Sequence, residues 1–149
     1  MSDPIPYTAI TQAIASQLET RLTGQSPRPR VTWEAGLEAP DESLVNVKLV
    51  SRVAIPNQQA LTAGRLLRMR LRFEVSCWRF GMTVLEGMRL RDSLIGDIEL
   101  ALMADRTMGS TVTRSWLEGG TMNKPPEPRA LGFLIGGTTM LAADAQAQV

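Results

Sequence analysis

A stretch of strictly alternating residues in the middle of the chain constrains the fold more than any other feature. From Leu67 to Trp78, apolar residues occupy every second position, and three arginines, a glutamate, a serine and a tryptophan occupy the positions between them. Alternation with a period of two is typical of a β-strand with one buried face, because successive side chains point to opposite sides of a sheet. The sequence therefore predicts a long strand with an apolar core face and an arginine-rich outer face.

A second long strand is predicted at residues 44–55, before Pro56. One parity holds Val45, Val47 and Leu49, and the other holds Asn46, Lys48 and Arg52. We expect the two strands to form an antiparallel hairpin. A strand of about twelve residues would be about 40 Å long, at roughly 3.3 Å per residue. Because a compact domain of this size needs less, we expect part of the hairpin to extend beyond its own core.

Two amphipathic helices are predicted, one on each side of this hairpin in the sequence. The first covers residues 7–22 and is expected to bury Ile10, Ile14 and Leu18. The second covers residues 82–105, and its apolar stripe contains Leu85, Met88, Ile95, Ile98 and Leu102. This stripe is wide enough to cover the apolar face of the hairpin.

The other segments predict shorter strands and loops. Residues 31–35 are expected to form a short strand, and residues 111–118 and 131–141 a further strand pair. Three prolines within residues 119–129 argue against regular structure there, the glycine pairs at 119–120 and 136–137 suggest turns or bulges, and the tail ADAQAQV is expected to be weakly structured. The predicted fold is one α+β domain over residues 1–149, an antiparallel β-sheet with long hairpins, covered on one face by two helices.

The composition argues against an enzyme. The chain has no histidine and a single cysteine, Cys77, which excludes histidine-based catalysis and cysteine–histidine metal sites. No glycine-rich phosphate-binding motif is present, and the paired acids fit a solvated surface better than an acid–base pair. Cys77 lies on the apolar parity of its strand, so we expect a buried thiol. We therefore expect no catalytic residue, no cofactor and no metal.

The sequence also indicates a compartment. The N-terminal residues have neither the basic region nor the apolar core of a secretory signal, and no segment has the roughly 18 uncharged apolar residues that span a bilayer. A single cysteine cannot form an internal disulfide, which fits a reducing environment. The sequence therefore predicts a soluble intracellular protein with no membrane partner.

The arginine-rich face is the candidate functional surface. If the hairpin pairs as predicted, Lys48 and Arg52 share this face with the three arginines of the alternating strand. Like charges across a sheet repel, and one glutamate cannot balance five cations. Either the cations stay solvated and prevent edge-to-edge aggregation, or acids or phosphates of a partner, such as a neighbouring identical subunit, complete the row. The candidate interface residues are Lys48, Arg52, Arg68, Arg70, Arg72, Glu74 and Trp78.

The order of these elements resembles that of the tail terminator (tail-completion) proteins of tailed bacteriophages. The resemblance rests on LVNVKLVSRVAIP, then RLRFEVSCWRFG, a helix ending in IELALMADRTMG, and a closing GFLIGGTTML. It covers most of the chain as an order of elements and contains no invariant motif, so it transfers no functional residue.

The resemblance implies a structural virion protein that forms a homo-oligomeric ring, a hexamer, which caps the tail tube and joins it to the head or neck. The implied partners are other copies of the chain, the tail tube protein and a neck or head-completion protein, with a passing contact with genomic DNA. The implied location is the tail or neck of the virion, after assembly in the host cytoplasm.

Two other functions remain open. A neck or head-completion adaptor protein would share the same order of elements. From a different class, a small nucleic-acid-binding module would use Arg68, Arg70 and Arg72 to bind phosphates. The net charge of only +1 argues against this second alternative, because sequence-independent affinity for nucleic acid comes from accumulated positive charge.

Overall fold

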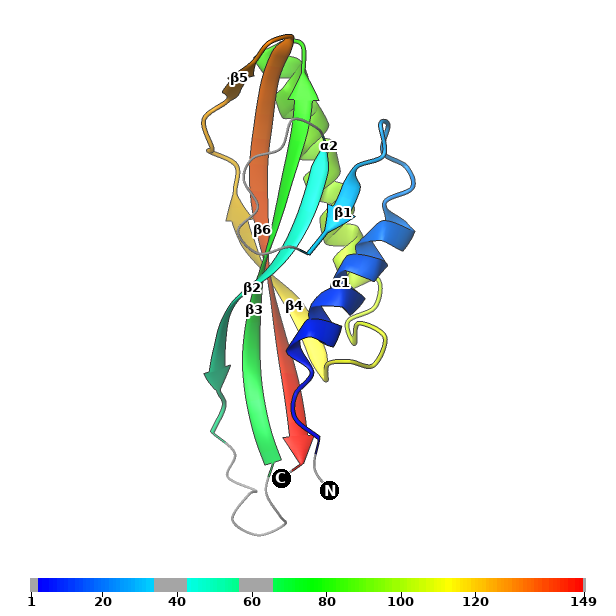
Figure 1. The fold of residues 1–149 in the computed structure, drawn as a ribbon, viewed down its shortest axis with the longest axis vertical. Helices are drawn as coiled ribbons and strands as arrows, with labels where there is room; N and C mark the ends of the chain where they lie inside the picture. Colours follow the sequence, from blue (N-terminus) through cyan, green and yellow to red (C-terminus); the bar gives the residue numbers. More distant parts are fainter. Residues whose placement is uncertain (1–2, 34–42, 57–65, 149) are drawn as a thin grey trace.

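The computed structural model describes residues 3–33, 43–56 and 66–148, which form two helices and a six-stranded sheet (Figure 1). In chain order the elements are α1 (Tyr7–Arg21), β1 (Arg30–Thr32), β2 (Leu44–Ala54), β3 (Leu66–Gly81), α2 (Val84–Met103), β4 (Arg114–Thr121), β5 (Glu127–Arg129) and β6 (Gly132–Gln148). The two predicted helices and the two predicted hairpin strands are confirmed, with ends that differ by a few residues.

The strands are ordered β1-β2-β3-β6-β4, and β5 pairs with the start of β6. β3 is the central strand: it pairs antiparallel with β2 on one side and, over its full length, with β6 on the other. The predicted α+β class is confirmed. One detail is different, because β1 runs parallel to β2, so the sheet is mixed and not purely antiparallel. β1 has only three residues, and the alternation in so short a segment cannot predict the direction of the strand.

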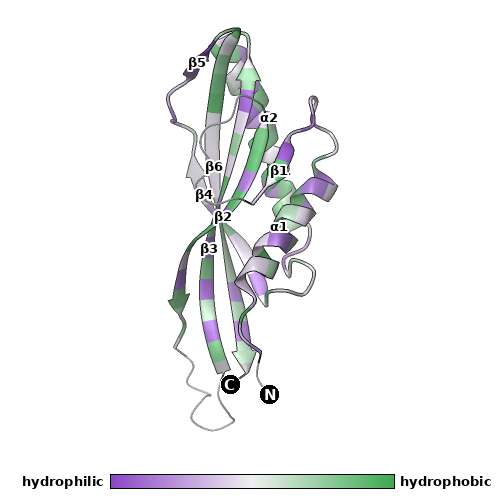
Figure 2. Cartoon of the chain, in the orientation of Figure 1, coloured by the Kyte–Doolittle hydropathy of each residue, from purple (hydrophilic) through white to green (hydrophobic). Residues whose placement is uncertain are grey.

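Both helices pack on the apolar face of the sheet. Ile10, Ile14 and Leu18 of α1 are buried as predicted, and they join Phe73 and Leu71 of β3 in one core. Figure 2 shows the alternation of hydrophobic and hydrophilic residues along the first half of β3. The first residues of β3 and the last residues of β6 lie beyond both helices in Figure 1, in agreement with the expectation that the hairpin extends past the core.

The predicted apolar stripe of α2 is wrong in its first half. Leu85 and Met88 are 57% and 40% exposed, and the buried positions there are Gly87 and Arg91. The reason is a close approach of helix and sheet, since a Cβ atom on Gly87 would lie 2.5 Å from Cγ1 of Ile135. The helix can approach the sheet only at its glycine, and this rotates the larger apolar side chains outward.

The C-terminal tail was predicted to be weakly structured, and this prediction is wrong. β6 continues to Gln148, with β3 on one side and, as far as Asp144, β4 on the other. Ala143 and Ala145 are buried in the core on the helix side of the sheet, and Ala142 is buried on the outer face between Arg72 and Trp116. The low hydrophobicity of the tail residues therefore gave no indication that they form part of an interior strand of the sheet.

The predicted loop at residues 119–129 is also partly a strand. β4 extends to Thr121, and Pro128 in β5 pairs with Phe133. Proline is compatible with an edge strand, where its missing N–H group leaves no inner ladder bond unmade. Gly119 lies at a bulge with a φ of +84°, as expected, whereas Gly136 and Gly137 are inside β6 and not in a turn.

Candidate functional site

The row formed by Arg68, Arg70 and Arg72 lies on the face of β3 opposite the core, as predicted. These residues alternate with Leu71 and Phe73, both fully buried beneath the helices. Pairing of β3 with β6 and of β6 with β4 extends the outer face across two further strands. The outer face therefore includes side chains of β4 and β6 that the predicted hairpin lacked.

Asp144, in β6, is the acid that pairs with the middle arginine of the row. Its Oδ1 lies 3.0 Å from Nε of Arg70, and its Oδ2 lies 3.1 Å from Nε of Arg114. Both guanidinium groups also lie over the Trp116 ring, at 4.9 and 5.1 Å from its centroid. Burial alone would raise the pKa of Asp144, which is only 3% exposed, but the hydrogen bonds and charges of the two arginines hold that pKa below its usual value.

Arg72 also has a partner in the same chain. Its Nε lies 2.9 Å from Oε1 of Glu118, at the bulge of β4. Arg70 and Arg72 therefore pair with carboxylates of their own chain, and a contact of the row with carboxylates of a neighbouring subunit stays a prediction. Asp144 lies in the tail, which was predicted to be weakly structured, and Glu118 ends the predicted strand 111–118, whose place in the sheet the sequence did not indicate. A substitution of all three arginines by glutamate would consequently place a carboxylate against the buried Asp144 and disturb the fold.

Arg52 does not share the outer face with the row. A bulge between Leu49 and Ser51 shifts the register, so Arg52 pairs with Leu71 and lies on the helix side. Its guanidinium lies 5.3 Å from the centroid of the Tyr7 ring of α1. One extra residue in β2 is enough to reverse the parity, since side chains alternate with a period of two.

Lys48 and Glu74 are paired in register on the outer face, as predicted, and Glu74 accepts a hydrogen bond from the Ser76 hydroxyl. Arg68 makes no ion pair within residues 3–33, 43–56 and 66–148. Of the candidate interface cations, Lys48, Arg52 and Arg68 thus make no ion pair within the described residues.

Trp78 is the last residue of the candidate interface on the outer face, but its side chain is buried within the subunit and is not available to a partner. It is 9% exposed, packs with Leu44 and Leu134, and has the ammonium group of Lys124 at 5.3 Å from its ring centroid. Gly136 leaves the room that the indole fills, because a Cβ atom there would lie 3.1 Å from Nε1 of Trp78. Its role is to close a second, small apolar cluster.

No reactive group emerges in the part of the chain that is described. Cys77 is buried as predicted, and burial raises the pKa of its thiol to about 12. Within the same residues no cluster of cysteine and acidic side chains could hold a metal ion.

Sequence reasoning missed two buried arginines on the helix side of the sheet. Arg79 is fully buried and donates to the Pro27 carbonyl at 2.5 Å and to Oε1 of Gln25 at 2.7 Å. Arg91 donates to the carbonyls of Met122 and Gly136. Arg79 continues the apolar parity that ends at Cys77, and that position was the available signal of its burial.

Replacement of Asp144 by asparagine is expected to lower the free energy of unfolding by about 1–3 kcal/mol, because two arginines lose a charged, buried acceptor. The native pKa of Asp144 lies below its unfolded value, so its contribution is present above about pH 4 and is lost as the pH falls through the native pKa. Urea unfolding at several pH values measures both effects: the difference between wild type and variant should shrink below about pH 4.

The matched control is Glu118→Gln. This residue pairs with Arg72, but the two side chains are 29% and 41% exposed. Such a pair contributes about 0–1 kcal/mol. Equal losses in the two variants would contradict the central role of Asp144.

In the described part of the chain, no helix is long and apolar enough to cross a membrane. Comparison with known proteins assigns no family: no family model and no curated protein matches this sequence.

Proposed function

We propose that this protein is a structural component of a phage particle, a tail terminator that forms a ring, caps the tail tube and joins it to the head or neck. The proposal combines the resemblance in the order of elements with one feature of the structure. Exposed apolar side chains gather at the two ends of β3, the strand that runs the length of the molecule.

The two ends carry different side chains. At the beginning of β3, Leu67 is 41% exposed on the helix side of the sheet, and Val53 of the neighbouring strand, which pairs with Arg70, is 53% exposed on the outer face. Just after its end, Met82 is 73% and Leu85 57% exposed, beside Leu131, which precedes β6 and is 83% exposed. Monomeric proteins rarely expose several large apolar side chains together, so such groups favour contact surfaces.

Two unlike surfaces at opposite ends favour one mode of assembly. A contact between one end of a subunit and the other end of its neighbour is heterologous, and repetition of a heterologous contact closes a ring if the rotation allows it. A ring of about six subunits, as the resemblance implies, would use this contact at every interface. The same resemblance implies that the tail tube ends in a closed circle of subunits, which a ring of this protein would cover.

The first test is the mass of the protein in solution. Wild-type protein is expected to form a closed ring, and Leu131→Asp is expected to give the 16.3 kDa monomer. A charge placed in an apolar contact loses its hydration, which costs several kcal/mol without a partner. Leu131 is almost fully exposed in the subunit, so the variant subunit should stay folded and lose only the thermal stability that assembly of the ring adds. Native mass spectrometry and thermal unfolding measure the two properties.

The matched control is Leu100→Asp. Leu100 is 74% exposed on the last turn of α2 and belongs to neither end group. This variant should form the same ring as the wild type. A wild-type monomer, or a ring that persists in Leu131→Asp, would refute the proposed contact. Capping itself is tested by adding the protein to a growing tail tube, which should stop elongation in electron micrographs.

The nucleic-acid alternative receives less support from the geometry. Asp144 and Glu118 already bind the guanidinium groups of Arg70 and Arg72, which phosphates would otherwise bind. Binding to phosphates would have to displace these carboxylates. DNA affinity that falls steeply with salt would favour this alternative over a ring protein.

A further inference from the structure

We propose that the open edge of β2 beside α1 binds an extended, acidic segment of a partner polypeptide, which joins the sheet as an additional strand. The inference does not depend on the ring proposed above. It rests on unpaired backbone groups, on a groove of suitable shape and on the charges that flank it.

The edge of β2 is only partly covered. β1 pairs with the first three residues, Leu44–Asn46, and no described strand pairs with residues 47–54 on that side. The Ile55 N–H donates to the Arg68 carbonyl at 2.8 Å, so Ile55 faces β3. Backbone groups alternate along a strand, and those of Arg52 and Ala54 must therefore point to the open side. Unpaired edge groups of this kind are a template for another strand.

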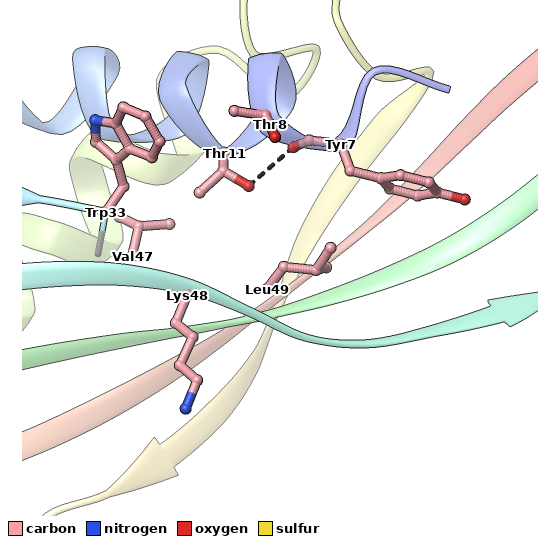
Figure 3. Close-up of a pocket in the computed structure, with 7 residues that line it drawn as sticks. All are labelled: Tyr7, Thr8, Thr11, Trp33, Val47, Lys48 and Leu49. Carbon is pink, nitrogen blue, oxygen red and sulfur yellow. Dashed lines mark hydrogen bonds between the residues drawn. The ribbon is translucent and has the colours of Figure 1, made fainter. Parts of the chain in front are cut away.

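A groove follows this edge. It has a volume of about 230 Å³ and lies between the first half of α1 and β2 (Figure 3). Its walls are formed by Tyr7, Thr8, Thr11, Trp33, Val47, Lys48 and Leu49. Trp33, which directly follows β1, is 43% exposed at one end of the groove, and Tyr7 is at the other end. Apolar walls with three hydroxyl groups suit the alternating side chains of an added strand.

The charge at the edge determines the partner. Lys48 is exposed and points away from α1 in Figure 3, while Arg52 lies on the α1 side over the Tyr7 ring. Among the described residues, no acidic side chain lines the groove. An added strand would thus meet a cation on each of its faces. This arrangement favours glutamate or aspartate in the partner and repels a second copy of the same edge, since like charges across an interface are unfavourable.

The probe is a short fluorescent peptide that alternates glutamate with valine and threonine. We expect it to bind the full-length protein about tenfold more tightly than a peptide with lysine in place of glutamate. N-methylation of alternate peptide bonds, which removes the donors that a strand needs, should abolish binding. Fluorescence anisotropy measures the affinities. Hydrogen exchange read by NMR should show slower exchange of the Arg52 and Ala54 amides when the acidic peptide is bound.

Variants separate this site from the ring contact. The double variant Lys48→Glu, Arg52→Glu should bind the lysine peptide in preference to the acidic one. Arg89→Glu, at an exposed position on α2, should bind like the wild type. Leu131→Asp should also bind like the wild type, whether or not the ring forms.

Three results would overturn the inference: equal affinity for the acidic and lysine peptides, undiminished binding of the N-methylated peptide, or unchanged exchange of the edge amides. Full binding with unchanged exchange would indicate charge attraction without strand addition.

Discussion

Replacement of Arg79 by methionine is expected to lower the free energy of unfolding by about 3 kcal/mol, because the buried Gln25 amide and two partly buried acceptors lose their donor together. Arg79 donates to the Pro27 carbonyl, to Oε1 of Gln25 and to the Ser43 hydroxyl. Methionine fills much of the space of the arginine side chain but has no N–H group that could donate a hydrogen bond. Oε1 of the buried Gln25 would then be left unpaired, which is the costly outcome for a buried polar group, whereas water can reach the exposed Pro27 and the half-buried Ser43.

The network around Arg79 connects three parts of the fold. Gln25, in the segment after α1, accepts from Arg79 and donates to Oδ2 of Asp97 in α2 at 2.5 Å. No described carboxylate pairs directly with Arg79, and burial lowers the pKa of its guanidinium. The Gln25 amide thus connects a buried cation to an acid. Loss of the cation should loosen the segment after α1 as well as β3.

Thermal unfolding measures this effect, since 1 kcal/mol shifts the midpoint by roughly 2–8 °C. The control is Arg89→Met, at an exposed position on α2, which should change stability by less than about 0.5 kcal/mol. The double variant Arg79→Met, Gln25→Met is expected to recover part of the loss, because it also removes one orphaned acceptor. A melting temperature of Arg79→Met close to that of wild type would show that the network contributes little.

Replacement of Gly81 by alanine is expected to be similarly severe, at about 3 kcal/mol or more. Gly81 ends β3, three residues before α2. A Cβ atom there would lie 2.3 Å from the backbone nitrogen of Gly87 and 2.6 Å from its Cα. Both contacts are with backbone, which cannot rotate away as a side chain can. The start of α2 would have to move off the sheet, and the packing of Gly87 on Ile135 would be lost.

Gly96→Ala, in α2, provides the matched control for Gly81→Ala. A Cβ atom on Gly96 meets nothing within 4 Å, and the residue is exposed in the interior of α2. Alanine there should raise the free energy of unfolding by up to about 1 kcal/mol, because glycine is the poorer helix former. Urea unfolding compares the two variants. Equal and small effects would mean that the turn between β3 and α2 adapts to an extra methyl group.

The local pattern of residues was sufficient to predict β2, β3 and both helices, and the buried faces of β3 and α1. The alternation from Leu67 to Trp78 requires a strand, and the recurrence of Ile10, Ile14 and Leu18 requires a helix with one buried face. Each of these inferences uses only neighbours within a few residues. That is why β3, β2 and both helices were predicted correctly, together with an outward row of arginines and a buried Cys77.

Long-range pairing decided the rest. Asp144 meets Arg70 only because β6 runs antiparallel to β3, and the low hydrophobicity of ADAQAQV gave no sign of that strand. The bulge of β2 moved Arg52 to the helix side, and the close approach at Gly87 turned Leu85 and Met88 outward. Register, bulges and helix–sheet distance depend on contacts between residues far apart in the chain. Periodicity within one segment contains no information about them, so only the tertiary structure could show which charges are paired and which apolar side chains remain exposed.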